Sequence, residues 1–158
     1  MDRRQLLARM DKAWVEFQGS YAGLSESEML ERGVAGVWSV RDMIAHVTWW
    51  EEEALKHLPH ILQGRRPPRY SVTYGGIDAF NALMTERKKA LSLAEVLREQ
   101  EQTHRRVIEL IEHTPEEQFS RETRWRHRLK SDTWGHYPKH AAAIRRWRAK
   151  RHMTRATQ

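Results

Sequence analysis

The chain has 158 residues, no cysteine and a formal net charge of +7, with 28 Lys and Arg against 21 Asp and Glu. This length is typical of one domain with one core. The absence of cysteine excludes disulfides, thiolate metal ligands and a cysteine nucleophile. No apolar run is long enough to span a bilayer, and residues 1–4 are not followed by a signal-peptide core. We therefore expect a cytoplasmic protein without a membrane segment.

Two long amphipathic helices are predicted in the first half of the chain. Apolar residues recur at intervals of three and four in the first helix, at Leu6, Met10, Trp14, Phe17 and Tyr21. The second helix should begin after an N-cap at Ser39, with Asp42 in the capping-box position, and Pro59 is expected to limit it. Its inward stripe consists of Met43, His46, Val47, Trp50 and Ala54.

A long connection is expected from Pro59 to Gly76, where Gly and Pro are frequent. Residues 77–90 predict an additional helix after it. Ser92 and Glu95 form another capping box, which should start the third main helix. The inward stripe of this helix includes Val96, Leu97, Gln100, His104, Val107, Leu110 and Ile111.

The end of the chain is harder to interpret. Residues 121–130 are polar and basic without helical periodicity, so we expect no helix there. The last helix should begin near Asp132 or Thr133 and continue through His136, His140, Ile144 and Trp147. Pro138 conflicts with this start, because a proline beyond the first turn removes a hydrogen bond and clashes with the preceding turn. Either the helix starts later, or its first turn is distorted.

These patterns predict an all-α protein, a four-helix bundle with one long crossover between the second and third main helices. No segment has a convincing strand pattern. The expected domain comprises residues 1–152, and residues 153–158 are expected to form a disordered tail.

Three histidines are the candidate functional residues. His136 and His140 are four residues apart, so their rings would project from the same face of a helix. His46 lies on the inward stripe of the second helix. Three imidazoles that meet inside a bundle can bind a divalent transition metal such as Zn, Ni or Fe and leave a coordination position open. A shared metal would also satisfy three interior polar groups at once.

Alternatives remain open at this point. With nine histidines in the chain, a pair spaced by four residues can arise by chance, and the three rings can be ordinary core residues. His104 is a candidate fourth participant on the inward side of the third helix, although such a residue is more often a hydrogen-bonded core histidine. Trp49, Trp50, Trp134 and Tyr137 are near the candidate ligands in sequence, and they can line a pocket or simply fill the core. Glu51 or Glu52 can be considered as a proton acceptor, but neither is assigned.

Gly36–Glu51 and Asp132–His140 resemble the DinB-like superfamily of bacterial four-helix-bundle proteins, and are most similar to its ClbS/DfsB (DinB_2-like) branch. The segments 73–81, 93–97 and 141–147 extend the resemblance over nearly the whole chain. It implies the DinB/YfiT-like metalloenzyme fold, in which one histidine of the second helix and two of the last helix hold a divalent metal. Those positions are matched here by His46, His136 and His140.

The same resemblance implies a function. Some relatives use the metal to activate a low-molecular-weight thiol, such as mycothiol or bacillithiol, and others hydrolyse or sequester a reactive genotoxic metabolite. We therefore expect a metal-dependent hydrolase or thiol transferase, which activates water or an external thiol against a small reactive or xenobiotic substrate. The alternative is a non-catalytic stress-resistance protein that binds and sequesters a small molecule. The resemblance also implies a homodimer.

Positive charge is concentrated near the C-terminus. Residues 121–155 contain twelve Lys and Arg against two acidic residues. Such a segment is usually a solvated helix face, although it can also bind nucleic acid, an anionic ligand or an acidic partner. A nucleic-acid contact would use Arg145, Arg146, Arg148, Lys150 and Arg151. No groove-reading motif accompanies these residues, so we do not expect nucleic-acid binding.

Overall fold

Every regular element in the computed structural model, which describes residues 1–158, is a helix. The only extended pairing is an isolated bridge between Ala35 and Trp38. The all-α prediction is therefore confirmed. In chain order the helices are α1 (Arg3–Tyr21), α2 (Glu26–Met29), α3 (Val40–Leu62), α4 (Tyr70–Thr73), α5 (Ile77–Lys88), α6 (Leu93–Glu112), α7 (Glu117–Ser120), α8 (Arg124–Asp132) and α9 (Tyr137–Ala156).

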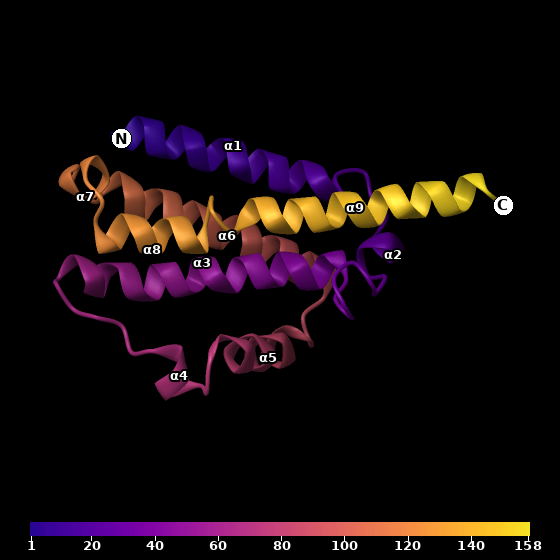
Figure 1. The fold of residues 1–158 in the computed structure, drawn as a ribbon, viewed down its shortest axis with the longest axis horizontal. Helices are drawn as coiled ribbons and strands as arrows, with labels where there is room; N and C mark the ends of the chain where they lie inside the picture. The colour runs from indigo at the N-terminus through magenta and orange to yellow at the C-terminus, as the bar shows by residue number, and fades with distance from the viewer.

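The long helices form a four-helix bundle whose fourth member is broken into two pieces. α3 packs against α6 and α8, while α1 packs against α9 and α6. Figure 1 shows α8 and α9 following one another along the bundle, with the last turns of α9 extending beyond the other helices. The predicted bundle is confirmed.

Apolar stripes and capping boxes explain why these helices form where they do. In α1 the predicted residues Leu6, Met10, Trp14 and Phe17 are all buried. At the start of α3 the Ser39 side chain accepts a hydrogen bond from the Asp42 backbone, and the Asp42 carboxylate accepts one from the Ser39 backbone. An equivalent pair of bonds starts α6 at Ser92 and Glu95. α3 is the central helix, since most of its residues from Val40 to Ala54 are buried.

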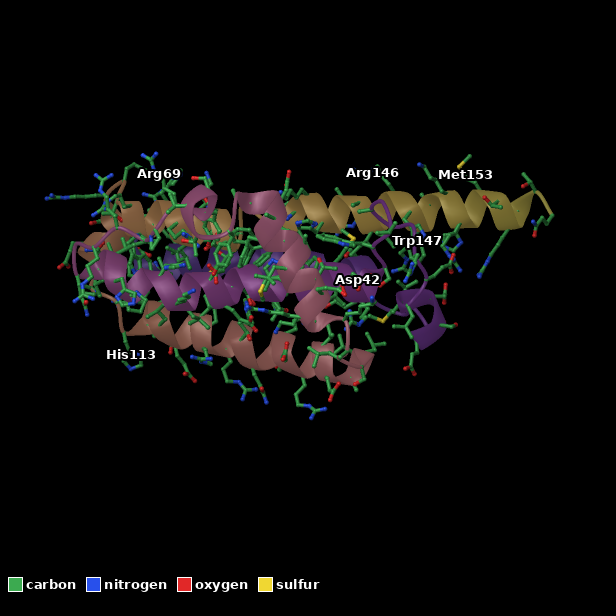
Figure 2. The ribbon with its side chains drawn as sticks, turned by 90° about the horizontal axis from the view of Figure 1, so that it is seen from below. Asp42, Arg69, His113, Arg146, Trp147 and Met153 are labelled. Atoms are coloured by element: carbon green, nitrogen blue, oxygen red, sulfur yellow. The ribbon has the colours of Figure 1, made fainter.

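The predicted long crossover connects α3 to α6 and carries two helices of its own. α5 packs on α3, and α4 packs on α5. Figure 2 shows this crossover lying across the outer side of α3. Pro59 limits α3 less sharply than expected, because the helix continues to Leu62. The Pro59 carbonyl still accepts a hydrogen bond from Gln63, so that the last turn remains closed.

The sequence-based prediction for the C-terminal region was wrong in two respects. Residues 124–132 form α8, although no helix was expected there, and Asp132 ends this helix instead of starting the next one. α9 begins only at Tyr137, with Pro138 in its first turn. The amide of a residue in the first turn has no intrahelical partner, so the proline costs no hydrogen bond there. Of the two alternatives left open, the later start is the one observed.

A tight turn of four residues joins α8 to α9. The Gly135 amide donates to the Lys130 carbonyl at 2.9 Å, and the His136 amide donates to the Thr133 carbonyl at 2.7 Å. The Thr133 hydroxyl donates to the Leu129 carbonyl at 2.6 Å. A Cβ atom added to Gly135 would lie only 2.7 Å from the Lys130 carbonyl oxygen. Glycine is therefore required by the close approach of the two backbone segments.

The last helix, α9, continues to Ala156. The expected disorder of residues 153–158 stays a prediction. None of the helices is both long enough and apolar enough to cross a membrane.

We predict that Gly135→Ala lowers the free energy of unfolding by about 1–3 kcal/mol, because the new methyl group must displace the Lys130 backbone. Urea denaturation would measure this. Gly19→Ala is the matched control, since a Cβ atom at this helical position meets nothing within 4 Å. It should be neutral or stabilise by up to about 1 kcal/mol. Equal effects of the two substitutions would contradict the close approach at Gly135.

Candidate metal centre

The three candidate histidines come from two helices that lie next to each other. His46 is on the buried side of α3, His136 caps the N-terminus of α9, and His140 follows one turn later on α9. His46 and His136 are buried, and His140 is partly buried. The turn between α8 and α9 brings His136 toward α3. The structure therefore brings together all three residues that the sequence analysis selected.

Their Nε2 atoms converge. The His46 and His136 Nε2 atoms are 3.1 Å apart, and those of His136 and His140 are 2.8 Å apart. One candidate ligand atom from each residue can be chosen so that all three lie within 4.8 Å of one another. Three nitrogens at tetrahedral positions around one ion would be about 3.4 Å apart, given Zn–N bonds of about 2.0–2.1 Å. The arrangement needs only small adjustments to fit such an ion.

Burial keeps all three rings neutral at neutral pH. Loss of solvation lowers the pKa of His46 to about 3 and that of His136 to about 2. It lowers the pKa of His140 to about 4, with a further contribution from the nearby charge of Lys139. Metal binding requires the neutral imidazole, so the ligand form is the form present at pH 7.

A divalent ion fits this donor set. The His136 Nε2 atom faces two other ring nitrogens, and one proton cannot satisfy both contacts. A cation at their meeting point would bind all three lone pairs. The buried Nδ1 atoms of His46 and His136 have no hydrogen-bond partner in the chain. This differs from the usual metal site, in which a second hydrogen bond orients each imidazole ring.

Aromatic contacts orient the His46 ring instead. The rings of Trp38 and Trp49 each have their centroid 4.8 Å from that of His46. The indole N–H groups of Trp49 and Trp50 both donate to the Asn81 side-chain oxygen of α5, at 3.2 Å and 3.1 Å. The crossover is thereby fixed to the part of α3 that carries His46.

The other predicted aromatic neighbours have different roles. Trp134 belongs to the second core cluster, together with residues such as Trp125 and Leu129. Tyr137 is fully buried, and its hydroxyl donates to the Glu51 carboxylate. Neither residue lines the pocket beside the histidines.

Glu51 is the centre of a buried polar cluster behind the histidines. Besides the Tyr137 hydroxyl, it contacts the His104 Nδ1 atom at 2.9 Å, and the His104 ring stacks on Trp14. Burial raises the pKa of Glu51, while the hydrogen bond from His104 opposes that shift. The cluster joins α1, α3, α6 and α9. His104 therefore does not join the three-histidine group as a fourth member.

Glu52, the other glutamate considered, points elsewhere. It pairs with Lys88 at 3.2 Å, and Lys88 also pairs with Glu99 at 2.7 Å. These contacts connect α3, α5 and α6, and Glu52 does not line the pocket.

A pocket of about 250 Å³ opens beside the histidines. Its wall includes two of the three histidines and residues from α3, α5, α8 and α9: His46, Trp50, Ile77, Asn81, Ser131, Asp132, His136 and Lys139. Sequence reasoning missed Asn81, Asp132 and Lys139. Asp132 was considered only as a possible start of the last helix, because α8 had not been recognised. The signal available in the sequence was the position of Asp132, whose carboxylate lies four residues before His136.

Comparisons with known proteins agree with this picture. A family model described as the DinB superfamily matches residues 9–142. The chain belongs to the DinB superfamily. The predicted resemblance is therefore confirmed. No curated protein matches the chain.

Solved structures with the same fold include three relatives of low sequence identity. The structure called "Sibling Lethal Factor Precursor - DfsB" has a TM-score of 0.79 at 17% identity, covering 96% of this chain and 97% of its own. An uncharacterised protein from Escherichia coli UTI89 has a TM-score of 0.78 at 15% identity, covering 96% and 95%. The colibactin self-resistance protein ClbS, solved in complex with double-stranded DNA, has a TM-score of 0.76 at 12% identity, covering 92% and 94%. At these identities the likeness shows the shared fold.

We predict that the metal-free protein loses stability as the pH falls below about 6.5. The unfolded chain takes up protons on its histidines near that pH, whereas folded His46, His136 and His140 resist protonation until about pH 3, 2 and 4. The unfolded state therefore binds more protons, and the free energy of unfolding decreases toward acid pH.

Urea denaturation of chelator-treated protein at a series of pH values would measure this loss. His140→Gln removes one of the three groups, so its free energy of unfolding should depend less on pH than that of the wild type. Parallel pH profiles for the two proteins would contradict the burial of a neutral imidazole at this position.

Proposed function

We propose that His46, His136 and His140 hold a divalent transition metal, and that the protein is a metal-dependent enzyme. It would use water or an external thiol against a small reactive or xenobiotic substrate. The convergence of three neutral Nε2 atoms beside a pocket is the observation that carries this proposal. Zn, Ni and Fe all suit such a nitrogen donor set.

When bound, a divalent ion lowers the pKa of a water or thiol in its open position, so that the nucleophile is available near neutral pH. The chain's own residues would bind and orient the substrate. Trp50 and Ile77 offer apolar surface on the pocket wall, while Lys139 is exposed at the same pocket and forms no ion pair. Lys139 would attract an anionic group of the substrate. Since the chain has no cysteine, a thiol nucleophile must come from a cofactor.

The proposed site predicts the metal content of the protein and of two histidine variants. Protein purified without an affinity tag should contain about one transition metal per chain, or acquire it on reconstitution with Zn, Ni, Mn or Fe. His140→Ala should lose the metal while keeping its helical circular dichroism, because the bundle is held by its apolar core. His152→Ala is the matched control, an exposed histidine on the same helix that should leave the metal content unchanged.

Elemental analysis would measure the metal in all three proteins. Wild-type protein that stays far below one metal per chain after reconstitution would disprove the site. Metal retained in His140→Ala would disprove the assignment of that ligand.

The alternative is a binding protein that sequesters a reactive small molecule without turnover. The two functions differ in a direct assay, in which glutathione reacts with an aryl halide such as 1-chloro-2,4-dinitrobenzene in the presence of metal-loaded protein. A thiol transferase of the proposed class gives multiple turnovers that stop when a chelator removes the metal. A sequestering protein gives at most one equivalent of bound substrate, with an affinity that metal removal leaves unchanged.

Nucleic-acid binding needs a separate test, because the structural neighbour ClbS was solved with double-stranded DNA. Some basic groups of α9 are already engaged within the chain. Arg148 donates to the carbonyls of Ser20 and Ala22, and Arg151 pairs with two glutamates beside α2. Arg146 points away from the bundle in Figure 2. We predict at most weak binding to duplex DNA, which decreases steeply with added salt and is measurable by fluorescence anisotropy. Tight, salt-resistant binding would contradict this prediction.

The expected homodimer also stays a prediction.

A further inference from the structure

Asp132 is the one carboxylate on the wall of the histidine pocket. It is the last residue of α8, and only 4% of its surface is exposed. Its Oδ2 atom accepts a hydrogen bond from the Arg128 Nε atom at 2.6 Å. Its Oδ1 atom accepts no hydrogen bond from the chain and is not among the buried atoms without a partner. One oxygen is therefore held in place, and the other is available to the pocket.

A partly buried polar network holds Arg128 on the far side of this carboxylate. The Arg128 Nη2 atom donates to the Tyr70 hydroxyl at 2.8 Å, and that hydroxyl donates to Glu53 at 2.6 Å. Glu53 also contacts the His57 Nε2 atom at 3.1 Å. These bonds fix Arg128, and through it Asp132, in one orientation.

The network leaves Asp132 only partly neutralised. Arg128 forms its ion pair with Asp132, and the Glu53 carboxylate beyond the Tyr70 hydroxyl adds a second negative charge nearby. Burial raises the pKa of Asp132 to about 6, although Arg128 opposes that shift. The charged or titratable groups around it are Arg128, Glu53 and His57 on its own side, and His46, His136 and Lys139 across the pocket. A carboxyl group in these surroundings can take up and return a proton near neutral pH.

The remaining pocket residues are less suited to accept a proton. Ser131 donates its hydroxyl to the His127 carbonyl, and Asn81 is a neutral amide that binds two indoles. Glu51 is fully buried behind the histidines and does not reach the pocket. The apolar wall formed by Trp50 and Ile77 offers a surface for the carbon atoms of a small thiol.

We propose that Asp132 is a catalytic residue, the proton acceptor for a small thiol that enters the metal pocket. The S–H bond breaks, the electron pair stays on sulfur, and the proton forms a new O–H bond at Oδ1 of Asp132. Oδ2 keeps its bond to Arg128 throughout. The inference rests on the proposed metal site. It adds the residue that removes the proton from a neutral thiol, so that the thiol can bind there as a thiolate.

Cobalt-loaded protein allows the proton transfer to be followed without a substrate. Stopped-flow mixing with 2-mercaptoethanol, followed at the thiolate-to-cobalt absorption band, gives the association rate as a function of pH. The thiol is mostly protonated below about pH 8.5. Wild-type protein should bind it at a rate that changes little above about pH 6–7, because Asp132 removes the proton.

Asp132→Asn should bind only the preformed thiolate. Its association rate should then rise about tenfold per pH unit below the thiol pKa, and it should be at least about tenfold slower than the wild type at pH 7. The two proteins should converge at alkaline pH. Asp11→Asn, which makes the same change at an exposed residue of α1 outside the pocket, should behave like the wild type. Cobalt affinity should be equal in all three proteins, because Asp132 is not a ligand in this proposal.

A failure of the metal site and a failure of the proposed role of Asp132 give different results. Wild-type protein that binds no cobalt would disprove the metal site itself. If the wild type binds cobalt but gives no thiolate band, or if its own rate rises about tenfold per pH unit, the role of Asp132 is overturned. This second measurement needs no variant, so it decides the question even if Asp132→Asn fails to fold. Loss of cobalt from a folded Asp132→Asn protein would make Asp132 a ligand and would also overturn the proposal.

Discussion

The turn between α8 and α9 is the constraint on which the candidate site depends. A continuous fourth helix would carry Pro138 in its interior, where it would lose a hydrogen bond and clash with the preceding turn. The break at residues 133–136 places the proline in a first turn and makes His136 the residue that precedes α9. It also leaves Asp132 at the end of α8, facing the same pocket. One interruption of the backbone thus positions a candidate ligand and a carboxylate together.

Buried polar groups surround the histidines in two clusters with different consequences. Glu51 contacts Tyr137 and His104 in the interior, where a polar group is stable only when it is paired. That cluster joins α9 to α3 and α6 and holds the first turn of α9 in place. The second cluster, which includes Arg128 and Asp132, borders the pocket and keeps one carboxylate oxygen free. The first cluster stabilises the helices that carry the histidines, and the second leaves one carboxylate oxygen available to the pocket.

The sequence predicted the bundle and the three histidines, because stripes spaced by three and four residues identify long helices and their inward faces. It did not reveal α8, since only Trp125, Leu129 and the polar Asp132 are buried in this nine-residue helix and its remaining residues are mainly basic. The pocket could not be predicted either. Asn81 reaches it from the crossover and Asp132 from the missed helix, and neither position carries a periodic signal. Tertiary packing, which no local pattern encodes, decides where these residues meet.

The hydrogen bonds of Asn81 to both indoles have a consequence for how such proteins diversify. Candidate ligands come only from α3 and α9, whereas Asn81 and Ile77 of the pocket wall come from α5. Part of the pocket wall is thus encoded by a segment that carries none of the candidate ligands. A crossover of different sequence could change which molecules enter while the three histidines remain in place. Under the proposed function, the crossover is therefore a segment in which substrate preference can be altered without changing the candidate ligands.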